Sequence, residues 1–297
     1  MRLKAFLKFC VLIASAVLLS MTTFVFGAMP MRAVRLAFGR LPFWAGFALA
    51  SASLAVAGLP AYALLVFSLV VLVGVYTDVE EHGGSVFISG FTGVLTAVGT
   101  TALCGGLWLH RAKIHLLDEV RSLLTQFEAA TVNANSTFTI NADTFIQQLP
   151  SAAVIALLVA LGIALIGETK LLSWVGYPKV QSPASDQRLS MFRIPDVFVW
   201  VAIAAIFGSF VKHGQAQVEL VSLNVLNVLV VMFFFQGIAI VSQAFRTFKV
   251  SPFWRGLWYV VLVFQLFFLV SLVGFADFWV EFRERLARKP AATNKSF

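Results

Sequence analysis

The chain has 297 residues, of which 60% are hydrophobic and 12% are charged. An ordinary soluble domain carries about 25% charged residues, so this composition excludes a soluble protein and predicts an integral membrane protein. The net charge of +8 indicates loops that meet lipid headgroups, and the absence of a long Lys/Arg run argues against nucleic acid as a partner.

Apolar stretches that could form membrane helices occur eight times along the chain. A spanning helix needs about 20 mostly apolar residues. We therefore expect an all-α polytopic bundle in a single membrane domain, residues 1–297. The predicted spans are residues 5–28, 43–59, 60–77, 85–109, 149–167, 196–211, 219–245 and 255–279.

Three of these spans have an alternative reading. The stretch 5–28 follows basic residues, as a signal peptide would, but its apolar run exceeds the roughly 7–15 residues of a signal sequence, so we expect it to be retained. The spans 43–59 and 60–77 are short and joined at Gly58-Leu59-Pro60, so a tilted or re-entrant hairpin is possible there.

An amphipathic helix is predicted at residues 110–130. Leu116, Val120 and Leu123 recur at steps of three and four residues, with Arg111 and Glu128 at other positions. Such a helix lies at the membrane interface or docks on a partner subunit. The alternative is a simple extension of the fourth span.

Charge determines the orientation weakly. With the N-terminus inside, 12 of the 22 Lys and Arg residues are inside and the other 10 are outside. We favour both ends inside, because both are basic and the acidic segment with Asp78, Glu80 and Glu81 then faces outward.

The sequence predicts no enzyme. It has no HExxH, GxSxG or Walker A motif, and no paired carboxylates inside a predicted span, so we expect no ATP hydrolysis and no cofactor. Cys10 and Cys104 lie in apolar stretches and are interpreted as packing residues, and the four scattered His residues predict no metal site.

The fifth span has alanines at strict four-residue spacing. These residues share one helix face, and small side chains let a second helix approach closely. We predict a helix-packing seam, although alanine is also simply common in this chain. The seam consists of Ala152, Ala156, Ala160 and Ala164.

The seventh span is the most polar. Gln236 and Gln243 are seven residues apart on one face, and Gln265 on the eighth span could meet either of them. An amide in lipid must find a partner, which is either a neighbouring helix or a solute in a wet cavity. Gly237 is expected to leave open space beside Gln236.

Residues 190–286, in the C-terminal half, contain three characteristic blocks. They are Phe192-Arg193-Ile194-Pro195-Asp196, Phe233-Phe234-Phe235-Gln236-Gly237 and Gly274-Phe275-Ala276-Asp277-Phe278-Trp279, the last followed by Phe282-Arg283. With these blocks the segment resembles the YybS-like predicted membrane proteins of bacteria, a family that is distantly similar to the substrate-capture subunits of energy-coupling-factor transporters. The resemblance implies capture of a vitamin or metal ion in the cytoplasmic (inner) membrane, with the ATPases on separate chains.

Two functions follow. The first is a small-solute binding or transport subunit, with Gln236, Gln243 and Gln265 as hydrogen-bonding candidates and Arg193 at the rim of the site. The alternative is a non-catalytic structural or assembly subunit of a membrane or envelope complex. In that case the amides join helices, and the alanine seam or the amphipathic helix docks on other membrane subunits. Both functions have the lipid bilayer as a partner.

Overall fold

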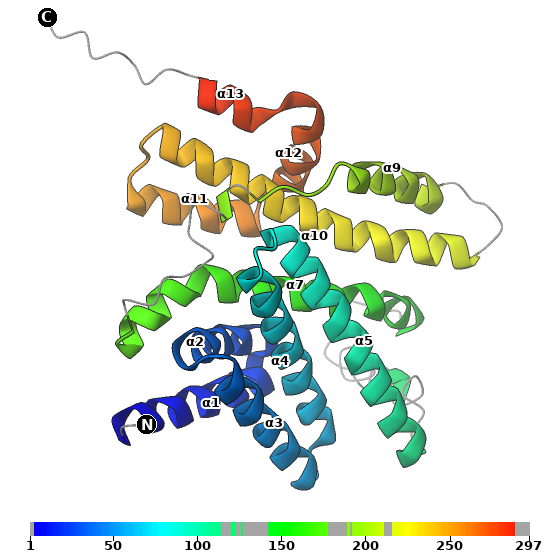
Figure 1. Cartoon of the computed structure of the whole chain (residues 1–297). Coiled ribbons are helices and arrows are strands. Elements are labelled where there is room, and N and C mark those ends of the chain that lie inside the picture. Colours follow the sequence, from blue (N-terminus) through cyan, green and yellow to red (C-terminus); the bar gives the residue numbers. More distant parts are fainter. Residues whose placement is uncertain are drawn as a thin grey trace, which may run out of the picture. The chain divides into compact units, whose positions relative to one another are not determined.

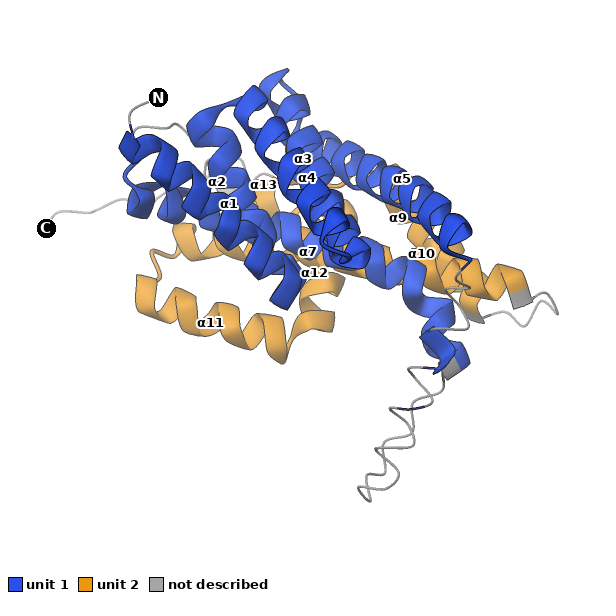
Figure 2. Cartoon of the chain, turned by 90° about the horizontal axis from the view of Figure 1, so that it is seen from below, with its two compact units in different colours: residues 1–183 blue, residues 184–297 orange. Residues whose placement is uncertain are grey.

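The computed structural model describes residues 3–113, 120–122, 126, 142–177, 189–190, 192–210 and 216–288. Every regular element among these residues is a helix (Figure 1), which confirms the all-α fold class. The sequence predicts one domain, whereas the structure divides the chain into two compact units, Met1–Pro183 and Ala184–Phe297 (Figure 2).

Unit 1 is built around α4, which packs against α2, α3 and α5, while α7 packs against α2. Its core includes Phe43, Leu69 and Tyr76, all fully buried. Pro60 begins α4 at a position where its missing N–H leaves no helix bond unmade. The described elements of this unit are α1 (Leu3–Thr23), η1 (Phe24–Gly27), α2 (Ala28–Phe38), α3 (Arg40–Val56), α4 (Pro60–Glu81), α5 (Val86–Ala112) and α7 (Ala142–Val175).

In unit 2 the long helix α10 packs against α9, α12 and α13. The predicted eighth span is broken: α11 and α12 form a pair bent by 95° at Gln265 and Leu266. No Pro or Gly lies at this break, so the local sequence gives no warning of it. The described helices are α9 (Val197–Phe210), α10 (Ala216–Thr247), α11 (Pro252–Phe264), α12 (Phe267–Val280) and α13 (Phe282–Arg288).

The helices are those of a multi-pass membrane protein. In the described part of the chain, five helices are long and apolar enough to cross a membrane, or six if the bent pair is one span. The helices Arg40–Val56 and Val197–Ser209 are apolar but shorter, so all eight predicted apolar stretches are helical while fewer can span. The predicted amphipathic helix at 110–130 lies mostly outside the described residues.

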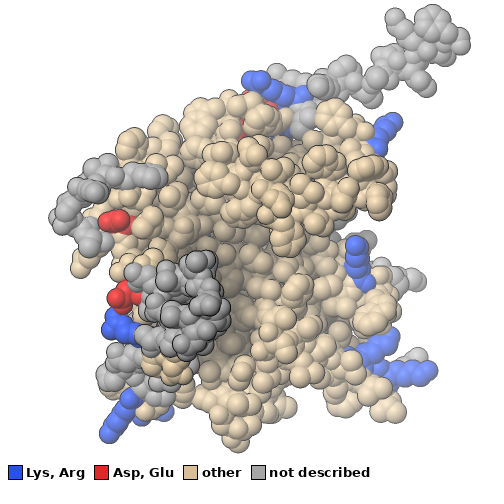
Figure 3. Space-filling view, turned by 180° about the vertical axis from the view of Figure 1, so that it is seen from behind, with Lys and Arg blue, Asp and Glu red and all other residues tan. Residues whose placement is uncertain are grey.

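Large apolar side chains are exposed on both units, among them Leu107 on α5 and Trp258 on α11. Charged side chains are few on the face shown in Figure 3. Such surfaces suit contact with lipid. Cys10 and Cys104 are also exposed, so the prediction that they are packing residues is wrong.

Candidate functional site

The most deeply buried charges among the described residues form an ion triad in unit 1. Arg32 on α2 donates from Nη2 to Glu80 Oε2 on α4 at 2.6 Å and from Nε to Glu168 Oε2 on α7 at 2.7 Å. The three side chains are 0%, 1% and 0% exposed. We call Arg32, Glu80 and Glu168 the inner triad. It joins three helices that are each part of a segment long enough to span a membrane.

The remaining polar groups of the triad are also engaged. Arg32 Nη1 donates to Thr77 Oγ1 at 2.6 Å, and the Thr77 hydroxyl donates in turn to the carbonyl of Val73. The Tyr76 hydroxyl donates to Glu80 Oε1 at 3.3 Å, while the guanidinium of Arg32 lies 5.0 Å from the centre of the Tyr76 ring. The arginine therefore uses all three of its nitrogen atoms inside the protein.

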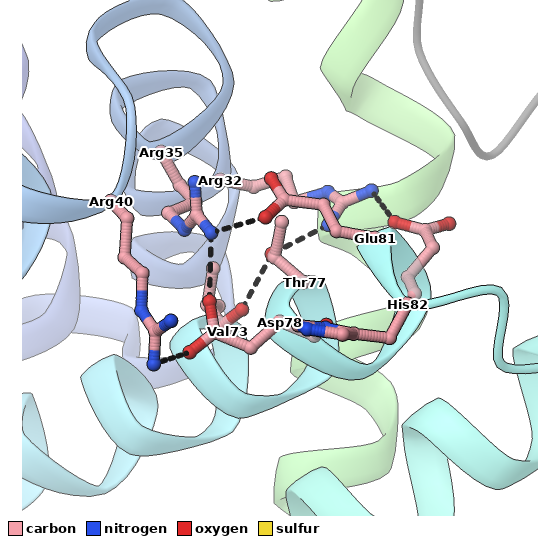
Figure 4. A network of polar contacts seen from close by, with 9 residues as sticks. Arg32, Arg35, Arg40, Val73, Thr77, Asp78, Glu81 and His82 are labelled. Atoms are coloured by element: carbon pink, nitrogen blue, oxygen red, sulfur yellow. Dashed lines mark hydrogen bonds and ion pairs between the residues drawn. The ribbon is translucent and has the colours of Figure 1, made fainter.

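A second set of charges, the outer cluster, continues from the triad (Figure 4). Arg35 Nη2 lies 2.7 Å from both Asp78 Oδ1 and Glu81 Oε2, and Arg40 Nη2 lies 3.2 Å from Asp78 Oδ2. Arg35 is nearly fully buried, whereas 62% of the Arg40 side chain is exposed. The outer cluster thus runs from the buried triad toward the surface of unit 1.

The spacing of the residues explains this register. Arg32 and Arg35 are three residues apart on α2, and Glu80 lies two residues beyond Asp78 on α4, so each arginine faces its own acidic set. Gly39 follows α2 with φ of +86°, a conformation that glycine adopts without strain. The chain can therefore turn there and bring Arg40 back to Asp78.

The alanine seam leads into the triad. Glu168 is the next four-residue step after Ala160 and Ala164, and all three residues are fully buried. Ala156 is half-buried and Ala152 is exposed. The buried half of the predicted seam therefore lies inside unit 1, on the same face of α7 as Glu168.

Two carboxylates lie in apolar helices just beyond the ends of the predicted spans 60–77 and 149–167. Glu80 lies in α4 and Glu168 in α7, both helices that could cross a membrane, and both side chains bind the same arginine. The sequence places these charges at the ends of apolar stretches, where hydropathy alone predicts loops. Ion pairs with Arg32 let both helices continue through these carboxylates.

Unit 2 has its own polar centre at Gln236 on α10, which is 4% exposed. Its Oε1 accepts from the backbone N–H of Ile194 at 2.9 Å. Its Nε2 donates to the carbonyl of Gly274 at 3.0 Å and to Asp277 Oδ2 at 3.4 Å. The amide thus ties the segment before α9 to α10 and α12.

Arg283 closes the same centre from α13. Its Nη2 donates to the carbonyl of Phe192 at 2.6 Å and to that of Gln236 at 3.4 Å, and its Nε lies 3.6 Å from Asp277 Oδ2. Burial lowers the pKa of the Arg283 guanidinium; Asp277 acts in the opposite direction and Arg193 adds to the lowering. Asp277 Oδ1 also accepts from the N–H of Phe282 at 3.0 Å.

The helices around Gln236 pack too closely for the open space expected beside it. A side chain at Gly237 would collide with the carbonyl oxygen of Val270, and one at Gly274 with that of Phe233. The expectation that Gly237 leaves open space is therefore wrong. The two glycines instead allow α10 and α12 to meet backbone to backbone.

The family described as "Predicted membrane protein (DUF2232)" matches residues 5–278 of the chain. The chain belongs to this family. The match includes both the inner triad and Gln236, so both lie within the part shared with other DUF2232 proteins. No curated protein and no solved structure matches the chain. The resemblance to YybS-like proteins and to transporter capture subunits stays a prediction.

The residues predicted to form a solute site in this DUF2232 protein do not all meet. Arg193 neighbours the Ile194 that binds Gln236, but its own side chain is half-exposed and pairs with Asp196 at 3.1 Å. Gln243 is half-buried two turns further along α10. Gln265 is exposed at the break after α11. The three sequence blocks do converge, on Gln236 and Arg283.

The charges of unit 1 are the site that sequence reasoning missed. Arg32 and Glu168 are 136 residues apart, so no local pattern connects them. The sequence did contain one signal. With the N-terminus inside, the predicted spans place the segments around Arg32 and Glu80 on the same side of the membrane. No group of three or more His, Cys, Asp and Glu suited to a metal ion occurs among the described residues.

Proposed function

We propose that the chain is a small-solute binding or transport subunit of a bacterial cytoplasmic membrane, without an ATPase of its own, and that its polar centre is the inner triad. One observation carries this proposal: a guanidinium and two carboxylates are fully buried where α2, α4 and α7 meet. Ionisable residues within membrane helices are expensive, and they usually mark an ion or substrate pathway.

Stability alone does not explain why the helices are joined by an ion triad. A buried ion pair is often no more stable than well-packed apolar residues of similar volume, because both charges lose their water. In the predicted seam, Ala160 and Ala164 are fully buried in the same unit without any charge. The retention of three buried charges beside that seam therefore supports a role that uses charge.

Gln236 is less suited to bind a solute than the sequence suggests. Its oxygen and nitrogen both have partners from the protein, at 2.9 and 3.0 Å. With 4% of the residue exposed, this amide has little surface left for a solute. Gln236 is better explained as a tie between helices, which moves the proposed solute site to unit 1.

The test is thermal unfolding of the purified full chain with a panel of water-soluble vitamins and divalent metal ions. A ligand at 100 times its Kd stabilises the folded state by about 2.7 kcal/mol, so a true ligand raises the melting temperature. Glu80→Gln should abolish that rise. Glu81→Gln is the matched control, because Glu81 is the next residue on α4 and its side chain is 44% exposed.

Two results contradict the proposal. If no compound in the panel shifts the melting temperature, the chain is not a capture subunit for these solute classes. If a compound stabilises Glu80→Gln as well as the wild type, the solute does not bind at the triad. A rise in the wild type and in Glu81→Gln, lost in Glu80→Gln, supports both parts of the proposal.

The second candidate function is a non-catalytic assembly subunit of a membrane or envelope complex. The observation in its favour is the hydrogen bonding of Gln236 and Arg283, which serves only to join segments of unit 2. Native isolation of the chain from membranes separates the two functions. Recovery of an ATPase and a membrane coupling subunit supports transport, whereas recovery of a motor, secretion or envelope complex supports assembly.

A further inference from the structure

The charges of unit 1 do not balance where they are most deeply buried. In the outer cluster, Arg35 and Arg40 face two carboxylates, those of Asp78 and Glu81, so that set is neutral when fully ionised. In the inner triad, one guanidinium faces the two carboxylates of Glu80 and Glu168. The triad therefore has an excess charge of −1 when all three groups are ionised, with no exposed side chain among them.

An uncompensated buried charge is far more costly than a neutral group, and buried carboxyl groups are usually neutralised instead. A bound cation or a proton could remove the excess charge. A metal ion needs several oxygen, nitrogen or sulfur ligands, and no suitable group of His, Cys, Asp and Glu occurs among the described residues. A proton needs a single carboxylate oxygen.

The hydrogen bonds identify which oxygen is free to take that proton. Both oxygens of Glu80 already accept, Oε2 from Arg32 and Oε1 from the Tyr76 hydroxyl. Glu168 Oε2 accepts from Arg32 Nε. Glu168 Oε1 is buried and has no hydrogen-bond partner among the described residues. A proton on Glu168 Oε1 gives a hydrogen to an oxygen that has no donor, whereas each oxygen of Glu80 already has one.

In the described part of the chain, Glu80 is the one other carboxylate that shares an ion pair with the partner of Glu168. Of the elements packed against α7, α2 presents Arg32 and α4 presents Glu80 with Tyr76. The short helix η1 has no ionisable side chain, and the basic residues of α5 are the exposed His110 and Arg111 in its last turn. On α7 itself the nearest charged residue, Lys170, is exposed.

We propose that Glu168 is a proton-binding site, and that its proton is the ion coupled to solute movement; the coupling rests on the proposed transport function. Binding forms an O–H bond at Oε1 with a proton delivered by water, and release returns that proton to water, with no change of oxidation state. When the proton leaves, the triad gains its excess negative charge. Arg32 is then shared by two ionised carboxylates, which favours a different packing of α2, α4 and α7.

The test is infrared spectroscopy of the purified full chain in lipid nanodiscs, titrated between alkaline and acidic buffer. A protonated carboxyl group absorbs at a carbonyl frequency distinct from that of a carboxylate and shifts in deuterated water. We expect the wild type to show this band at neutral pH and Glu168→Gln to lose it. Glu81→Gln, which alters a part-exposed carboxylate of the outer cluster, should keep it. Absence of the band in the wild type, or its persistence in Glu168→Gln, overturns the proposal.

If Glu168→Gln does not fold, the wild type provides a second measurement. Dicyclohexylcarbodiimide reacts with protonated carboxyl groups in apolar surroundings, and peptide mass mapping locates the product. A label on Glu168 that is suppressed at alkaline pH supports the proton site. Labelling elsewhere but not on Glu168 overturns it.

The coupling is tested separately, in proteoliposomes with a pH gradient and whichever panel compound raises the melting temperature. The wild type should accelerate uptake of that compound with the gradient, while Glu168→Gln should show no response to it. If the infrared band is present but no compound binds, the transport function fails and the proton site stands. If a compound binds but the band is absent, the proton site fails and the transport function stands.

Discussion

Replacing Arg32 by methionine removes the only guanidinium from the inner triad and keeps a side chain of comparable length. Glu80 then loses its ionic partner in a site where its side chain is 1% exposed, and Glu168 loses the only hydrogen bond that the structure gives its carboxylate. Breaking a buried ion pair in this way costs about 3–5 kcal/mol, because the remaining charge is neither paired nor hydrated. Folded proteins have only about 5–15 kcal/mol of stability in total, so Arg32→Met should be barely stable.

The matched control is Arg40→Met, which makes the same chemical change on a side chain that is 62% exposed. An exposed ion pair contributes about 0–1 kcal/mol, so this variant should unfold close to the wild type. Denaturant unfolding of the three proteins in the same detergent, followed by tryptophan fluorescence, measures the difference. Equal losses in the two variants would show that Arg32 is not buried among carboxylates, and the reasoning would fail.

Three further substitutions test the packing of each unit by thermal unfolding. Gln236→Leu leaves the backbone N–H of Ile194 unpaired and should lose about 1–3 kcal/mol. Gln243→Leu on the same helix should lose less, and similar melting of the two variants would contradict the role of Gln236 as a tie. Gly237→Ala places a methyl group against a backbone carbonyl of α12 and should cost about 1–3 kcal/mol, and unchanged melting would mean the helices are further apart. Ala160→Leu should be destabilising by a similar amount, whereas Ala152→Leu, at an exposed position, should not be destabilising. Equal melting temperatures of these two variants would contradict the predicted packing seam.

Much of the fold follows from the sequence because lipid imposes one strong rule. Any spanning segment must satisfy its own backbone, so apolar stretches of sufficient length become helices, as all eight do here. The blocks around Ile194, Gln236 and Gly274 could also be singled out, and they do converge in unit 2. The bend at Gln265 could not be predicted, because neither Pro nor Gly marks it.

The inner triad was not predictable from hydropathy, for a physical reason. Considered singly, Arg32, Glu80 and Glu168 are charges that should end a span, and each lies near the end of an apolar stretch. Only when the helices pack do the charges pair with one another, at separations of 48 and 136 residues. Charges of opposite sign in segments expected on the same side of the membrane were the available signal.

The pairing of Arg32 with Glu168 underlies both the proposed function and the proton site, so a double-mutant cycle on this pair is the most direct test. The cycle compares the free energy of unfolding of Arg32→Met, Glu168→Leu and the double variant with that of the wild type. Because a hydrogen bond to a charged group contributes about 1.5–3 kcal/mol, the double variant should lose less than the sum of the single losses by that amount. Losses that add to within about 0.5 kcal/mol, as they do for residues that do not touch, would contradict the pairing.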